Sequence, residues 1–272
     1  MPFGPRRLLR SLNRAGAAVS SGDVPAVTSA VLRIWLRADT LGLADNDAVG
    51  TWPDESGFGN DAVQSTGSLK PLFRTGIQNG LPIVRFDGTD DEMDIPDAAG
   101  LDGDGDGYTI FLMMTERTIS AGAENVFLTK WNTGVDTTYQ IDNFNQTNPE
   151  LVWFTAATAT DVATNSFTTT SGLGRSSGTF DTLTFIYDRF NTPPNTGITR
   201  VRKNGSAITA SLFTVVPGVV PDSGGIVRLG GPINFHTQQG DMDLGEFLFY
   251  DGTLDATDLA AVEGYLLAKW AT

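Results

Sequence analysis

Short apolar runs, separated by residues that favour turns, make up most of this chain. Such runs are typical of β-strands, whereas an amphipathic helix repeats its apolar positions every three or four residues. The first run, residues 31–37, alternates in part and places Arg33 and Arg37 on one face. The pattern predicts an all-β fold, with strands at residues 31–37, 83–86, 109–114, 126–129, 139–142, 151–154, 183–187, 198–203, 226–229 and 244–250.

Two local signals add detail to this pattern. The pair Asn204-Gly205 predicts a tight hairpin after strand 198–203, because both residues accept a positive φ at little cost. A helix is predicted near the end of the chain, where Asp255 and Asp258 would lie in its first turn and oppose the helix dipole. Its predicted apolar face consists of Leu259, Val262, Leu266, Leu267 and Trp270.

Composition narrows the class of protein. The 272 residues, with 31 glycines and 13 prolines, suit one large β domain. The absence of cysteine excludes both a disulfide-stapled module and a thiolate metal site. No apolar run approaches the roughly 18 residues that a membrane-spanning helix needs, so we expect no membrane span.

Charge divides the chain into an arm and a body. The net charge is −14, yet the first 22 residues carry four arginines and no acid. An acidic body repels nucleic acid, so we expect no nucleic-acid partner. We divide the chain into an arm and linker at residues 1–30 and a domain at residues 31–272.

The basic arm has two readings. Its apolar residues are interrupted by arginine and asparagine, so it lacks the apolar core of a signal peptide and is expected to be retained. It is either a disordered terminus or a docking arm that orders on a partner. The residues predicted to contact that partner are Arg6, Arg7, Leu8, Leu9, Arg10, Leu12 and Arg14.

Four segments carry a resemblance to a known family. They are T-W-P-D-E-S-G-F-G-N-D-A at residues 51–62, L-P-I-V-R-F-D-G at 81–88, G-D-M-D-L-G-E-F-L-F-Y-D-G-T-L at 240–254, and the closing residues 261–270. Together they resemble the laminin-G-like jelly rolls of the concanavalin A-like lectin and glucanase superfamily. The resemblance implies a jelly-roll sandwich with a C-terminal helix, preceded in the chain by the short basic arm. It leaves the function open.

Catalysis is not expected from the acidic residues near the end of the chain. Glucanases of that superfamily carry E-x-D-x-x-E on one strand, and Asp241, Asp243 and Glu246 copy this spacing with a shortened first carboxylate. Glu246 would face the other side of the strand unless a bulge intervenes. An aspartate in place of the first glutamate withdraws the nucleophile by about one methylene, and positional errors of that size greatly lower the reaction rate. We therefore assign no catalytic residue.

An acidic tract at residues 102–107 reads D-G-D-G-D-G and matches the first half of an oxygen-donor calcium loop. An EF-hand would need a glutamate where Met113 stands, so a helix-loop-helix site is excluded. The tract is either a calcium-stabilised loop or an acidic solvated turn. The predicted Ca²⁺ ligands are Asp102, Asp104 and Asp106.

Carbohydrate binding needs flat apolar rings beside fixed hydrogen-bonding groups. The candidates are Trp131, Asn132, Tyr139, Asn143, Trp153 and His236, each of which has packing in the fold as its alternative role.

Three classes of function remain. The first is a non-enzymatic head spike, fibre or decoration protein on the surface of a phage or phage-like particle, a setting in which laminin-G-like domains are common. It would bind cell-surface polysaccharide as a homo-oligomer, with the arm anchored to a base or capsid protein. The second is a secreted or surface bacterial carbohydrate-binding module, and the third is a glycoside hydrolase. We expect the first, because it accounts for the arm and for the missing signal peptide.

Overall fold

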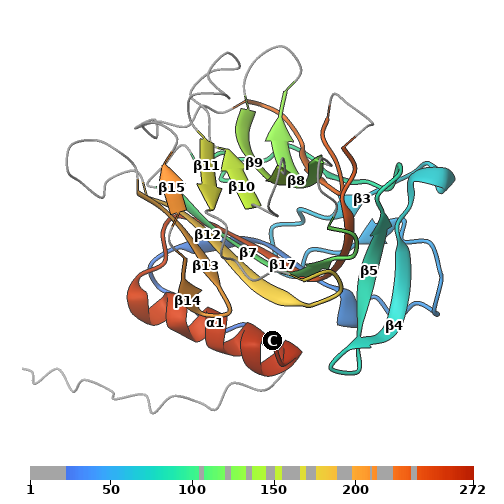
Figure 1. Cartoon of the computed structure of the whole chain (residues 1–272), viewed down its shortest axis with the longest axis horizontal. Coiled ribbons are helices and arrows are strands. Elements are labelled where there is room, and N and C mark those ends of the chain that lie inside the picture. The colour runs from blue at the N-terminus through green and yellow to red at the C-terminus, as the bar shows by residue number, and fades with distance from the viewer. Residues whose placement is uncertain are drawn as a thin grey trace, which may run out of the picture.

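The all-β prediction is confirmed. The computed structural model describes residues 23–103, 107–119, 124–132, 137–144, 151–154, 166–169, 176–188, 198–208, 210–212, 223–233 and 238–272. Two antiparallel sheets form a jelly-roll-like sandwich, and one C-terminal helix lies outside it (Figure 1).

The sheet next to the helix, sheet A, has eight strands. β1 pairs with residues 246–251 of β17, and β5 pairs with residues 241–244 of the same strand. The order is β14 (Ser206–Ala207), β13 (Ile198–Lys203), β12 (Asp181–Asp188), β7 (Gly107–Glu116), β17 (Asp241–Asp251), β5 (Leu81–Asp87) and β4 (Leu72–Gln78), with β1 (Val31–Arg37) beside β17.

The opposite sheet, sheet B, has nine strands. Two short 3₁₀ helices, η1 (Ala38–Thr40) and η2 (Gly67–Leu69), join strands of the two sheets. The order is β15 (Ala210–Leu212), β11 (Ser166–Thr169), β10 (Leu151–Phe154), β9 (Thr137–Phe144), β8 (Glu124–Trp131), β16 (Val227–Leu229), β6 (Met93–Ile95), β3 (Ala62–Val63) and β2 (Thr51–Trp52).

Each of the ten predicted strands is present, and the hairpin turn is confirmed by positive φ angles of 48° at Asn204 and 75° at Gly205. The missed strands are β2, β3, β4, β6, β11, β14 and β15. Six of these are four residues long or shorter, which is too short for alternation to show. The seventh, β4, contains Gly76 at φ 65° and shifts register against β5, which hides its pattern.

The space between the sheets is filled by apolar side chains from both. Trp52, from the segment 51–62 that carries the resemblance, is fully buried there. An aromatic cluster surrounds Tyr108, whose ring centroid lies 5.2 Å from that of Tyr139 and 5.3 Å from that of Tyr187. This interior holds the two sheets together by apolar burial.

The helix α1 (Ala256–Trp270) begins as predicted, because the Asp255 carboxylate accepts hydrogen bonds from the backbone N–H groups of Thr257 and Asp258. It packs on the outer face of sheet A through a second apolar cluster (Figure 1). One predicted contact residue is corrected: Leu267 is only half-buried, while Tyr265 is buried.

Candidate functional site

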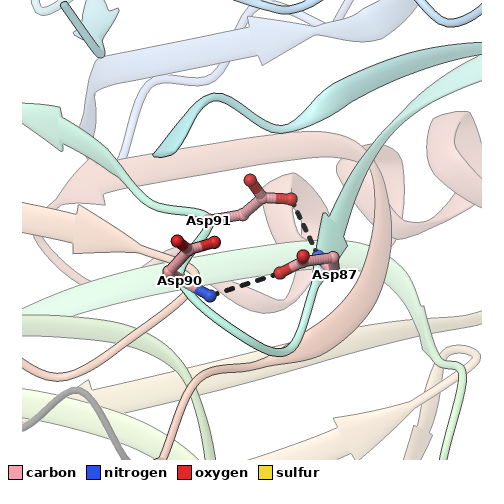
Figure 2. Close-up of side chains that lie close together, drawn as sticks. All are labelled: Asp87, Asp90 and Asp91. Atoms are coloured by element: carbon pink, nitrogen blue, oxygen red, sulfur yellow. Dashed lines mark hydrogen bonds between the residues drawn. The ribbon is translucent and has the colours of Figure 1, made fainter. Parts of the chain in front are cut away.

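Residues 87–91 have the sequence D-G-T-D-D, turn sharply after β5 and bring three aspartates together (Figure 2). Asp91 accepts a hydrogen bond from the Asp87 backbone N–H at 2.9 Å, and Asp87 accepts one from the Thr89 N–H at 2.8 Å. Gly88 has φ 75°, and a β-carbon there would lie 2.7 Å from that of Asp241. The turn therefore requires glycine at this position.

The aspartate turn has the composition of a cation site. One carboxylate oxygen from each of Asp87, Asp90 and Asp91 lies within 4.8 Å of the other two. Hard oxygen donors at this spacing suit Ca²⁺. This convergence was not predicted from the sequence, although the D-x-x-D-D spacing of residues 87–91 could have indicated it.

Burial, followed by the charges of Asp87 and Asp90, raises the pKa of Asp91 to about 7, although the hydrogen bond from the Asp87 N–H opposes the shift. The side chain is almost completely buried. Between the ordinary carboxyl pKa and about pH 7, the folded protein keeps this proton while the unfolded chain releases it. The contribution of Asp91 to stability therefore falls as pH rises through this window, and it is constant above it.

We expect Asp91→Asn to raise the free energy of unfolding at pH 8 by about 2 kcal/mol in the presence of a chelator, with no gain at pH 4. The amide keeps the acceptor for the Asp87 N–H and removes a buried charge. Urea melts at the two pH values measure the effect. Asp90→Asn, the control, removes a charge from the same turn at a more exposed site and should change stability much less. A stability gain that is equal at both pH values would contradict this titration.

The predicted calcium ligand Asp102 lies in a buried ion pair. Its carboxylate is 3.0 Å from the ammonium of Lys130, which also contacts Asp97 at 2.5 Å and donates to the Gly225 carbonyl at 2.6 Å. Lys130 is fully buried. If Asp102 turned away to bind a metal ion, the buried ammonium of Lys130 would lose one of its partners, which is unfavourable. Asp104 and Asp106 lie outside the described residues. As a calcium ligand, Asp102 fits poorly.

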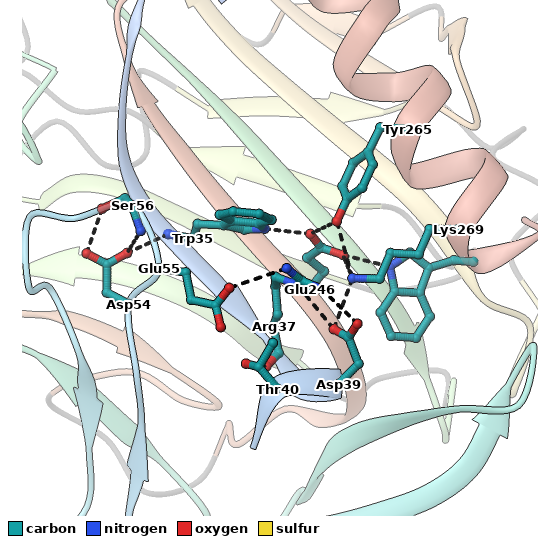
Figure 3. A network of polar contacts seen from close by, with 11 residues as sticks. Trp35, Arg37, Asp39, Thr40, Asp54, Glu55, Ser56, Glu246, Tyr265 and Lys269 are labelled. Carbon is teal, nitrogen blue, oxygen red and sulfur yellow. Dashed lines mark hydrogen bonds and ion pairs between the residues drawn. The ribbon is translucent and has the colours of Figure 1, made fainter. Parts of the chain in front are cut away.

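A buried carboxylate, Glu246, joins the helix to sheet A (Figure 3). It is fully buried and accepts four hydrogen bonds, of 2.6 to 2.9 Å. Lys269 extends the network to Asp39 at 3.0 Å. Burial opposes ionisation of Asp39, but hydrogen bonds from Arg37 and Lys269 outweigh it and lower the pKa of that carboxyl. The donors to Glu246 are the Trp35 and Trp270 indoles, the Tyr265 hydroxyl and the Lys269 ammonium.

The bulge that the glucanase spacing requires is present. The register of β17 against β7 shifts between Leu244 and Glu246, which puts Glu246 on the same outer face as Asp241 and Asp243. Arg85 holds Asp243 with two hydrogen bonds of 2.7 Å, and Arg117 holds Asp241 at 2.7 Å. Asp243 is 3% exposed and Glu246 is beneath α1, so two of the three carboxylates are closed to a substrate.

Within residues 51–62, a loop is held by Asp54 (Figure 3). Its carboxylate accepts hydrogen bonds from the backbone N–H groups of Trp35, Ser56 and Asn60 and from the Ser56 hydroxyl. Asp61 accepts the N–H of Asp54 at 2.7 Å. The polar motif residues therefore satisfy the backbone of β1 and of their own loop, which is a structural role.

The predicted sugar-contact residues do not form one site. Tyr139 and Asn143 are fully buried, which corrects their prediction as ligand contacts. Tyr139 belongs to the aromatic core, where burial raises the pKa of its hydroxyl, and the Asn143 amide donates to Glu116 at 2.8 Å. A saccharide outside the sandwich cannot reach either side chain.

Two of the other predicted sugar contacts, Trp131 and Asn132, lie at the end of β8. Trp131 and Asn132 are half-exposed there, and the Asn132 amide donates to the Ser223 carbonyl at 2.8 Å. Trp153 is described only through its backbone pairing in β10, opposite Ile141 and Phe167. His236 and the arm residues 1–22 lie outside the described residues.

Six residues, each paired with the next across neighbouring strands, form a row on the outer face of sheet B. Their neighbours along each strand point into the core, so alternation directs this row away from it. Exposure is greatest at the β2–β3 end, where Val63 is 41% exposed, whereas Thr129 is fully buried. The row consists of Thr51, Val63, Asp94, Arg228, Thr129 and Gln140.

The open end of this row is a hollow of about 460 Å³, which we call the edge hollow. It combines hydroxyl, amide and charged groups with one exposed apolar side chain, the mixture that sugar-binding sites use. No sequence signal marked it, because β2 and β3 are each two residues long. Its lining residues are Gly50, Thr51, Val63, Gln64, Ser65, Lys70 and Asp94.

Among the described residues, no helix is long and apolar enough to cross a membrane. No family model matches the chain. No curated protein resembles it in sequence at a significant level. The likeness to known proteins therefore comes from solved structures alone.

Three solved structures illustrate that likeness. The binding domain of Paraclostridial Mosquitocidal Protein 1 superposes with a TM-score of 0.59 at 12% identity, over 87% of this chain and 52% of that one. The binding domain of botulinum neurotoxin serotype D gives 0.56 at 8% identity, over 86% and 50%. Trypanosoma rangeli sialidase in complex with sialic acid gives 0.56 at 15% identity, over 93% and 35%. The chain thus spans about half of each toxin domain and a third of the sialidase, and what it shares with them is the β-sandwich fold.

Proposed function

We propose that this chain is a non-enzymatic carbohydrate-binding module that attaches a phage or phage-like particle to cell-surface polysaccharide. The observation that carries the proposal is the edge hollow, which is lined by two hydroxyl side chains, Lys70 and the exposed side chain of Val63. Saccharides present hydroxyl groups and apolar C–H faces together, so such a surface complements them. A sandwich keeps this hollow rigid, which limits the entropy cost of binding.

The state of the acidic residues supports a binding role without catalysis. A retaining glycosidase needs two carboxyl groups about 5 Å apart at a site that admits substrate. Asp243 is held by Arg85, and Glu246 is held by four donors beneath α1. A glycoside hydrolase is therefore the weakest of the three functions considered.

The particle role rests on the division of charge. The basic arm would dock on a base or capsid protein while the acidic domain projects from the particle surface. Homo-oligomers would increase avidity, since single-sugar contacts are weak. A secreted or surface bacterial carbohydrate-binding module is the alternative. Full incorporation into particles of a chain that lacks residues 1–22 would contradict the docking role.

Calcium belongs to this proposal as a stabilising ion. Asp87, Asp90 and Asp91 have the spacing to hold it, whereas Asp102 is committed to Lys130. The ion would neutralise the charge of the aspartate turn and would compete with protonation of Asp91.

We expect the full chain to be retained on a glycan array and on whole capsular polysaccharide, and to release no oligosaccharide. Binding is measured with and without calcium, and the bound polymer is followed by size-exclusion chromatography. A heat-unfolded sample is the control for nonspecific adhesion. Release of oligosaccharide would point to the hydrolase instead, and absence of any binding would point to a purely structural role.

A further inference from the structure

Lys70, which lines the edge hollow, differs from the other lysines and arginines that the structure describes. Among the side chains that the structure describes, every other lysine and arginine has an acidic partner within 4.0 Å. Lys70 has no acidic partner among the described residues, although the chain carries 32 acidic residues against 18 basic ones. In so acidic a protein, an unpaired ammonium that lines a hollow is available to an anion from outside.

Lys70 is positioned by the backbone beneath it. The residue follows η2, and its ammonium lies over Gly50, where a β-carbon would come within 3.1 Å of the nitrogen. The glycine therefore leaves room for the ammonium, and both residues line the edge hollow. The hydroxyl groups of Thr51 and Ser65 also line the hollow and have no hydrogen bond to another described residue.

The other polar groups of the hollow are already occupied. Both carboxylate oxygens of Asp94 accept hydrogen bonds from Arg228, at 2.7 and 2.9 Å. The Gln64 amide donates to the Glu92 carbonyl at 3.1 Å and accepts the Thr66 N–H at 2.9 Å. Arg228 also pairs with Glu92 at 2.8 Å, so it is already shared between two carboxylates. Among the described residues, Lys70 is therefore the one cationic side chain that lines the hollow.

We infer that the edge hollow binds a saccharide residue that carries a carboxylate, with the carboxylate on Lys70. This inference rests on the proposed function and specifies its ligand. The sugar hydroxyls would bond to Thr51 and Ser65, and its apolar C–H face would lie on Val63. The volume of about 460 Å³ suits one or two sugar rings rather than a long chain lying flat.

The test compares acidic polysaccharides with their neutral forms. Alginate, hyaluronan and oligogalacturonate are each used as they are and after chemical reduction of the carboxyl groups, and binding to the full chain is measured by titration calorimetry. We expect the acidic forms to bind, and Lys70→Gln to weaken binding by about tenfold or more. Lys70→Arg should retain most of the affinity. Arg74→Gln, which breaks an exposed pair with Asp45, makes the same change in net charge elsewhere and should have little effect.

The outcomes separate this inference from the proposed function. Equal binding of native and carboxyl-reduced polymers, unaffected by Lys70→Gln, would overturn the acidic subsite and leave carbohydrate binding intact. Binding to no polysaccharide, native or reduced and including the array glycans, would overturn both. A preference for a sulfated polymer such as dextran sulfate, or competition by inorganic sulfate at millimolar concentration, would overturn the carboxylate assignment in favour of a general anion site.

Discussion

Glu246→Ala is expected to lower the free energy of unfolding by about 3–5 kcal/mol. The change leaves two indole N–H groups and the Tyr265 hydroxyl buried without their acceptor, and it removes the buried partner of Lys269 beneath α1. The helix would lose its main polar attachment to β17. Thermal unfolding followed by circular dichroism should show a fall in Tm of about 10 °C.

Two variants bracket this result. Glu246→Gln keeps the shape but presents an amide N–H to groups that are themselves donors, so we expect an intermediate loss of about 2 kcal/mol. Glu55→Ala removes the partly exposed partner of Arg37 in the same region and should cost about 0–1 kcal/mol. If Glu246→Ala and Glu55→Ala had similar stability, the four-donor network would not be what holds the helix.

Gly107→Ala is expected to lower the free energy of unfolding by about 4 kcal/mol. Gly107 begins β7 with φ 123°, and a β-carbon there would overlap the backbone carbonyl of Tyr187 in β12. Strand pairing fixes both backbones, so neither can move aside cheaply. Urea unfolding measures the loss.

Gly57→Ala is the matched control for this prediction. Gly57 also has a positive φ, of 91°, but no atom lies within 4 Å of the added carbon, so only backbone strain of about 1 kcal/mol is expected. The difference between the two variants isolates the steric contribution. Equal losses would mean that β7 and β12 adjust around the extra carbon and that close approach does not constrain this strand.

The same glycine shows where sequence reasoning reached its limit. Gly107 ends the D-G-D-G-D-G tract, which suggested a calcium loop. In the structure, Asp102 pairs with Lys130, and Gly107 allows β7 to approach β12. Local spacing shows that carboxylates are close in the chain, but it cannot show which cation a distant strand brings to them.

The residues of the candidate site were also decided by contacts between distant segments. Trp131 and Tyr139 look alike as aromatic residues beside polar ones, yet the fold leaves the first half-exposed and buries the second among Tyr108 and Phe249. Lys70 lies in none of the sequence motifs. Its lack of an acidic partner among the described residues is a property of the whole arrangement of charges, which no window of sequence contains.

The sequence by itself determined the all-β class, ten strands, the Asn204-Gly205 hairpin and the capped C-terminal helix, because each depends on neighbouring residues: alternation, turn chemistry and helix capping. Only the tertiary structure decided the register of the short strands, the bulge that turns Glu246 toward α1, and the edge hollow. These depend on contacts between segments far apart in the chain, and their energies come from packing and charge pairing rather than from local propensity.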